Sequence, residues 1–114
     1  MVDYSKEIVA ALKTILPTHY EMTLHSGLKT PCISWQERSN IDRECGDTFG
    51  YSRISYTVKV WGDNIGELQQ YAMEIDKVLR PLGFKRISCG ELYSNQSSLI
   101  QKILAYEATA MEVY

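Results

Sequence analysis

Few residues of this chain have the type and spacing that metal binding would require. His19, Glu21 and His25 fall on one face of a predicted strand, an arrangement of possible metal ligands. At a rise of about 3.3 Å per residue, however, the two imidazoles would lie roughly 20 Å apart on a straight strand. That separation is too large for one ion, so we interpret these side chains as surface residues and expect no metal site.

Nucleophilic catalysis also lacks a candidate. The three cysteines are Cys32, Cys45 and Cys89, an odd number without a C-x-x-C pair, which disfavours a closed disulfide set and a cysteine-rich zinc site. The chain has no G-x-S-x-G motif and no signature that pairs a cysteine with a histidine. The sequence therefore predicts a reducing compartment, no cofactor and no enzymatic activity.

Two short motifs have a simpler explanation than chemistry. The run Gly62-Asp63-Asn64-Ile65-Gly66 could open a phosphate-binding helix, but it lacks the lysine and glycine spacing of a P-loop, and Asp63 would repel an anion. It is more typical of helix initiation. Asn95-Gln96-Ser97 has the pattern of a glycosylation acceptor, but nothing in the chain indicates secretion, so we interpret the match as chance.

A mixed-charge segment is the first candidate interaction site. Residues 38 to 50 carry both signs of charge, on Arg38, Asp42, Arg43, Glu44 and Asp47. Because Ile41 is the only aliphatic residue of the segment, the sequence predicts a long exposed loop. Two interpretations stay open: a solvated loop, or an interface element in which opposite charges on neighbouring copies set the register.

Two aromatic residues are the second candidate. Tyr51 and Trp61 close the polar side of a strong strand pattern, in which Ile54, Tyr56, Val58 and Val60 alternate with polar residues. Large aromatic side chains on a polar face are either single exposed residues or anchors for a partner. The sequence leaves both interpretations open.

The spacing of apolar residues predicts the helices and strands that position these candidates. Residues 3 to 16 have a helical period and stop at Pro17, after which residues 19 to 25 and 31 to 37 alternate as strands and could form a hairpin. Residues 65 to 82 predict a second helix, capped by Asn64, with its apolar face on Ile65, Leu68, Ala72, Ile75, Leu79 and Leu82. Gly83 can take a left-handed conformation at the end of this helix.

The last third of the chain is less uniform. Residues 83 to 93 predict a strand, and residues 94 to 98 have the composition of a turn. Local propensity favours a helix for residues 99 to 114, although Tyr106, Ala108 and Ala110 could alternate along a strand.

Composition bounds the class of protein. A chain of 114 residues with 45% hydrophobic and 23% charged residues predicts one globular domain. The net charge of −2 and the scattered basic residues argue against sequence-specific DNA binding. No apolar run reaches membrane-spanning length, so we expect a soluble protein made in the cytoplasm.

The order of segments resembles the tail-completion proteins of long-tailed bacteriophages and prophages, also called tail terminators or tail-to-head joining proteins. The resemblance rests on the helix, a short strand, the strand PCISWQE, a charged segment ending in Asp47, a Tyr-rich strand ending in V-x-V-W, a capped helix ending in L-x-x-L-G-F-K-R, and a last run of K-x-x-x-Y character. It covers nearly the whole chain.

The resemblance implies an α+β fold, one mostly antiparallel sheet flanked by two helices in the order α-β-β-β-α-β-β, with residues 99 to 114 as a strand. It also implies a homo-oligomeric ring, typically a hexamer, that caps the tail tube and meets a head-completion or neck protein. The ring would belong to the virion, with genome DNA only passing through its lumen and no membrane contact. The 38 to 50 segment would then contact neighbouring subunits or the tail tube.

Two other functions stay open at this point. One is a different phage neck or head-tail adaptor protein, because ring-forming neck proteins share this length and composition. The other is a small-ligand-binding or enzymatic α+β domain with its site between sheet and helix.

Overall fold

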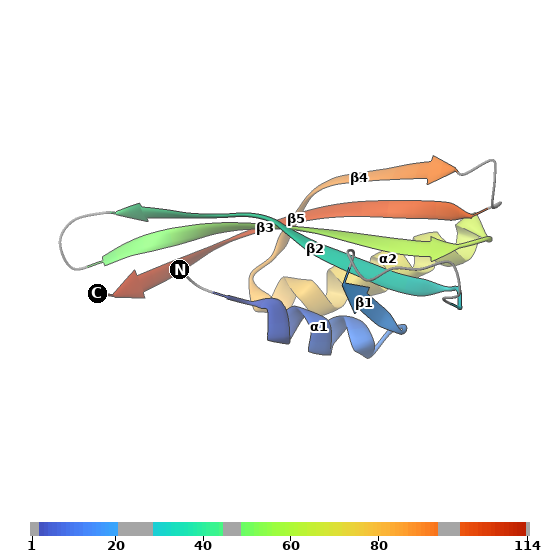
Figure 1. The fold of residues 1–114 in the computed structure, drawn as a ribbon, viewed down its shortest axis with the longest axis horizontal. Helices are drawn as coiled ribbons and strands as arrows, with labels where there is room; N and C mark the ends of the chain where they lie inside the picture. Colours follow the sequence, from blue (N-terminus) through green and yellow to red (C-terminus); the bar gives the residue numbers. More distant parts are fainter. Residues whose placement is uncertain (1–2, 21–28, 45–48, 94–98, 114) are drawn as a thin grey trace.

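A computed structural model describes residues 3–20, 29–44, 49–93 and 99–113. Within these residues, two helices and one five-stranded sheet form an α+β fold in the predicted order α-β-β-β-α-β-β (Figure 1). The elements are α1 (Ser5–Lys13), β1 (Thr18–Tyr20), β2 (Cys32–Glu44), β3 (Phe49–Gly62), α2 (Ile65–Leu79), the 3₁₀ turn η2 (Arg80–Leu82), β4 (Lys85–Tyr93) and β5 (Ile100–Val113).

The sheet has the spatial order β1-β2-β3-β5-β4. Neighbouring strands are antiparallel except β1, which runs parallel to β2 with Thr18 opposite Ile33. The predicted hairpin between residues 19 to 25 and 31 to 37 is therefore wrong, because strands joined by a hairpin must be antiparallel. Alternation identifies a strand but carries no information on its direction. Residues 21–28 of the first predicted strand lie outside the described residues.

Both helices cover the same face of the sheet, and the core lies between them and the strands (Figure 1). The predicted inward residues of β3 are confirmed, since Ile54, Tyr56, Val58 and Val60 are at most 1% exposed. The helix-covered face of β5 supplies Leu104 and Tyr106 to the same core. In the described residues, no helix is long and apolar enough to cross a membrane.

The junction between β3 and α2 follows the predicted helix start. The Asn64 side chain accepts a hydrogen bond from the backbone N–H of Glu67 at 3.1 Å. A β-carbon at Gly62 would lie 2.9 Å from Leu68 Cδ2, so a glycine lets strand and helix approach closely. At the other end, Gly83 adopts φ 94° after η2, the left-handed conformation predicted there.

The predicted apolar face of α2 is confirmed at Leu68, Ala72, Ile75 and Leu79, which are buried. Ile65 is an exception, with 53% of its surface exposed. It occupies the first helical position, before the buried stripe begins at Leu68, so periodicity alone overestimated the length of the buried face.

Residues 38 to 50 do not form the predicted long loop. β2 continues to Glu44 and β3 begins at Phe49, so only residues 45–48, which lie outside the described residues, separate the two strands. The segment has few apolar side chains, but backbone pairing with β3 gives it order without a core of its own. A prediction based on burial therefore missed it.

β2, β3 and β5 extend beyond the helices as a three-stranded arm (Figure 1). We define the arm by the paired segments 40–44, 49–54 and 108–113. It gives the molecule extents of 53 × 25 × 22 Å. At its base, β2 has a bulge at Arg38, where the register shifts between Glu37 and Ser39.

The C-terminal run is a strand, as the family resemblance implied. β5 pairs with β3 from Ile100 opposite Gly62 to Val113 opposite Phe49. Lys102, Leu104, Tyr106, Ala108 and Ala110 are buried at every second position, as on one face of a strand. Pairing with β3 along its whole length, and with β4 as far as Glu107, overrides the local helix propensity of β5.

Replacement of Leu79 by alanine should lower the free energy of unfolding by about 2–5 kcal/mol, because it leaves a cavity in a fully buried site. The matched control is Ile65→Ala on the same helix, which should change stability by less than about 0.5 kcal/mol since Ile65 is exposed. Urea unfolding of both variants measures the difference. Equal losses would contradict the assigned helix face.

Candidate functional site

The predicted interface residues lie mostly on the arm. Arg38 is exposed at the bulge, and Tyr51 is half-buried on β3. Asp42, Arg43 and Glu44 belong to β2, where the structure describes their backbone; Asp47 lies outside the described residues.

The strand register places the charged residues of β2 on two different faces of the arm. Asp42 stands opposite Ser52, Arg43 opposite Tyr51, and Glu44 opposite Gly50. Because neighbouring positions on a strand alternate between the two faces, Asp42 and Glu44 occupy register positions of one face of the arm and Arg43 of the other. The mixed charges are therefore distributed around the arm rather than gathered in one loop.

Trp61 does not join this group. It lies at the far end of β3, ten positions and thus roughly 33 Å along the strand from Tyr51. Its Nε1 donates a hydrogen bond to Ser34 Oγ at 2.9 Å, and Lys59 Nζ lies 6.0 Å from the ring centroid. The indole is half-buried and already uses its only donor within the domain.

The sheet face opposite the helices forms a shallow depression between two bulges. One bulge is at Arg38 on β2, and the other is at Ile87 on β4, where 55% of the isoleucine is exposed. Small side chains such as Thr57 and Ala105 form its floor, and its volume is about 400 Å³. Bulges have no clear sequence signature, so this feature could not be predicted.

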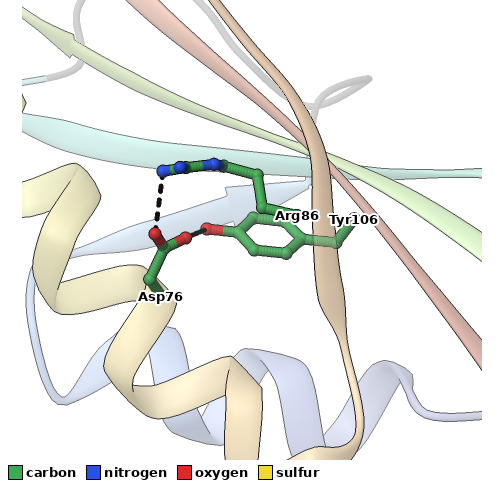
Figure 2. A network of polar contacts seen from close by, with 3 residues as sticks. All are labelled: Asp76, Arg86 and Tyr106. Atoms are coloured by element: carbon green, nitrogen blue, oxygen red, sulfur yellow. Dashed lines mark hydrogen bonds and ion pairs between the residues drawn. The ribbon is translucent and has the colours of Figure 1, made fainter.

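A polar cluster on the helix-covered face connects three elements (Figure 2). Asp76 of α2 accepts a hydrogen bond from the Tyr106 hydroxyl of β5 at 2.5 Å, and its other oxygen is 2.8 Å from Arg86 Nη1 of β4. Burial, followed by the hydrogen bond to Asp76, raises the pKa of Tyr106 far above its usual value. The hydroxyl thus stays protonated and serves as a donor, not as a base.

The same cluster borders a cleft of about 470 Å³, whose rim also includes Arg80, Lys85 and Phe84. The cluster holds no thiol, serine or histidine that could act as a nucleophile or shuttle a proton near neutral pH. The hydrogen bonds of the cluster hold α2 against the sheet. Sequence reasoning missed it, because the three residues come together only in the tertiary fold.

Lys102 is a second residue that sequence reasoning did not single out. It is 6% exposed on β5 and forms an ion pair with Glu91 of β4, with Nζ 2.6 Å from Oε1. The hydrogen bond that Lys102 donates to Glu91 raises the pKa of Lys102. This pair joins the last two strands of the sheet.

Tyr56 is the third buried polar group. Its hydroxyl lies 3.4 Å from Ser5 Oγ and donates to Glu37 Oε2 at 3.3 Å. Burial raises the pKa of Tyr56 to about 12, although the Ser5 contact acts in the opposite direction. The hydroxyl links the start of α1 to β2.

The structure describes some of the residues that the sequence offered as metal ligands or thiol nucleophiles. Among the described residues, no three His, Cys, Asp or Glu side chains come close enough to hold a metal ion. Cys32 is a buried free thiol whose pKa is raised by burial, and Cys89 is an exposed free thiol. Glu21, His25, Cys45 and Asn95 lie outside the described residues.

Replacement of Asp76 by alanine should lower the free energy of unfolding by about 1–3 kcal/mol, because Tyr106 and Arg86 each lose their acceptor. Glu74→Ala, which removes another carboxylate from the same helix, is the matched control and should cost less than about 0.5 kcal/mol. Thermal and urea unfolding measure both variants. Equal stability of the two would contradict the bracing role.

Alkaline pH should destabilise the fold through Tyr56. Its pKa is about 12 in the folded chain, whereas an unfolded tyrosine ionises near pH 10. Above pH 10 the unfolded state therefore releases a proton that the folded state retains, and the free energy of unfolding falls until about pH 12.

In Tyr56→Phe this part of the fall should be absent, so the pH profile should be shallower than in the wild type. Urea unfolding from about pH 9 to about pH 12 measures it. The other titrating groups, Lys102 among them, are common to both proteins and cancel in the comparison. Identical slopes would show that Tyr56 is not protected from ionisation.

No protein-family model matches the chain, and no curated protein matches it. Among solved structures, the chain is similar to one described as "Virion of native gene transfer agent (GTA) particle". The match covers 92% of this chain and 84% of that chain, with a TM-score of 0.68 and 12% sequence identity. At this identity the likeness establishes a shared fold over nearly the whole domain.

Proposed function

We propose that the protein is a structural component of a phage-like virion, and specifically a tail-completion protein that forms a ring on the end of the tail tube and joins it to the head-neck complex. The fold match to a chain of a gene transfer agent virion supports the first, broader part. The order of segments in the sequence, which resembles the tail-completion family, supports the second. The two lines of support are independent of each other.

The observation that carries the proposal is the helix-free arm (Figure 1). The arm extends past the helices, although its residues Ile54, Ala108 and Ala110 belong to the buried core. Beyond the helices, no described strand pairs with the outer sides of β2 and β5. Such an extension suits a subunit that builds contacts with neighbours, as in a closed ring where every copy uses the same two patches.

A structural role also agrees with how the polar groups are used. The buried or half-buried polar groups of the clusters described above bond to each other across elements, as in the Asp76, Arg86 and Tyr106 cluster. None of these clusters presents an activated nucleophile. In this proposal the protein is not an enzyme, requires no cofactor and makes no membrane contact.

The proposed partners are further copies of this chain, six in a ring, together with the tail tube protein and a head-completion or neck protein. Genome DNA would pass through the lumen. Arg38, Asp42, Arg43, Glu44, Asp47 and Tyr51 are proposed to lie at contacts between subunits or with the tube. Trp61, at the other end of β3, would contact a different part of the assembly.

A second candidate is another phage neck or head-tail adaptor protein. The structural likeness favours it equally, because the description of the similar structure names a whole particle and no single component. Binding to the end of the tail tube distinguishes the two functions, since a tail-completion protein must bind there.

The chain should form a discrete closed oligomer, expected to be a hexamer, and rings of it should bind to the ends of tubes assembled from the tube protein of its own genome. Native mass over a concentration series at low and moderate salt measures the first, and electron microscopy of mixtures measures the second. Rings that never bind tube ends would favour the adaptor alternative. A chain that neither assembles nor binds tubes would contradict both.

A further inference from the structure

The two outer strands of the arm each have an edge with no strand beside it in the described part of the chain. Among the described strands, β1 pairs with β2 at Ile33–Trp35, and none pairs with the outer side of β2 over Ile41–Glu44. β4 pairs with β5 as far as Glu107, and no described strand pairs with the outer side of β5 over Ala108–Val113. We call these the β2 edge (Ile41–Glu44) and the β5 edge (Ala108–Val113).

At the usual strand rise, the β2 edge is about 13 Å long and the β5 edge about 20 Å long. An uncovered edge exposes a row of backbone N–H and C=O groups that can pair with another strand, and proteins normally cover it or interrupt it with proline and charge. Neither edge contains proline, and the β5 edge carries only one charged residue, Glu112. The β5 edge therefore has little to prevent pairing.

The direction of the strands limits how copies can pair. β2 and β5 are both antiparallel to β3, so they run in the same direction. A second copy rotated about an axis along the strands brings its β5 edge beside the β2 edge of the first, and these strands are then parallel. A two-fold axis instead brings like edges together, β2 with β2 or β5 with β5, in antiparallel pairs.

We propose that the β2 edge of one copy pairs in parallel with the β5 edge of the next copy, so that the arms join into one continuous sheet around the ring. The inference depends on the proposed function for the closure of the ring, and it specifies the contact between subunits. The β2 edge of each copy is covered by the β5 edge of one neighbour, and its β5 edge by the β2 edge of the other neighbour.

Two observations favour this pairing over the two-fold alternatives. It covers both edges of every copy, whereas a two-fold dimer covers one edge and leaves the other exposed. It also places the charged positions of the β2 edge, Asp42, Arg43 and Glu44, beside a strand with one charge, instead of beside the same charged set.

Proline variants can block one edge at a time, because proline removes the backbone donor that pairing needs. Neighbouring residues of a strand direct their N–H groups to opposite sides. One of Thr109→Pro and Ala110→Pro therefore breaks a bond to β3 and destabilises the fold, while the other affects only the outer edge. The same holds for Ile41→Pro and Asp42→Pro on β2. In each pair, the variant with the higher melting temperature is the edge-blocked protein, and the other is its control.

Each edge-blocked protein alone should be monomeric at concentrations where the wild type is oligomeric. A 1:1 mixture of the β2-blocked and β5-blocked proteins should form a dimer of one copy of each, because one free β5 edge and one free β2 edge remain. Native mass spectrometry detects this species. A two-fold pairing would instead let one blocked protein dimerise with itself, and that result would overturn the proposal.

Hydrogen exchange of the wild type tests the same contact without relying on proline variants. Backbone amides of residues 41–44 and 108–113 should exchange at least tenfold more slowly at oligomer-forming concentration than in the diluted chain. Unchanged exchange in either segment would overturn the pairing. So would a wild type that stays monomeric, whereas the tube-binding experiment would still decide the proposed function.

Discussion

The pairing of β3 with β5 is the interaction on which the rest of the structure depends. These two strands run side by side over their full length, from Gly62 opposite Ile100 to Phe49 opposite Val113. β2 and β4 each attach to one side of this pair, and α2 packs on it through Leu68 and Ile75. Since the two strands are separated by α2 and β4 in the sequence, the centre of the sheet forms only when the two halves of the chain meet.

The helices cover only part of this long pair, and the consequence is a molecule with two differently stabilised regions. Beneath the helices, apolar burial dominates, and the polar groups there are satisfied by each other, as Tyr106 and Asp76 show. Beyond the helices, the arm relies on backbone pairing among three strands. The β2 segment of the arm, residues 40–44, can therefore be mostly polar, which suits a surface that contacts other chains.

Local sequence patterns predicted the parts of the fold that local forces determine. The alternation from Ile54 to Val60, the cap at Asn64 and the left-handed Gly83 each follow from a few neighbouring residues, and each is confirmed. The errors arose where distant pairing decides the outcome. Residues 38–44 form a strand because they pair with β3. Residues 100–113 form a strand because they pair with β3 and, as far as Glu107, with β4. The direction of β1 and the cluster around Asp76 likewise depend on segments far apart in the chain.

The number of strands in the arm has a geometric consequence for assembly. The arm has three antiparallel strands, so its two outer strands, β2 and β5, run in the same direction. The β2 edge of one copy can therefore pair in parallel with the β5 edge of another. An arm with an even number of strands would have outer strands of opposite direction. A repeated head-to-tail contact needs two different patches on each copy, and a ring closes when the rotation between copies divides a full turn. In the proposed pairing, the topology set by the β3–β5 pair would supply both patches from the backbone alone, without a specialised side-chain site.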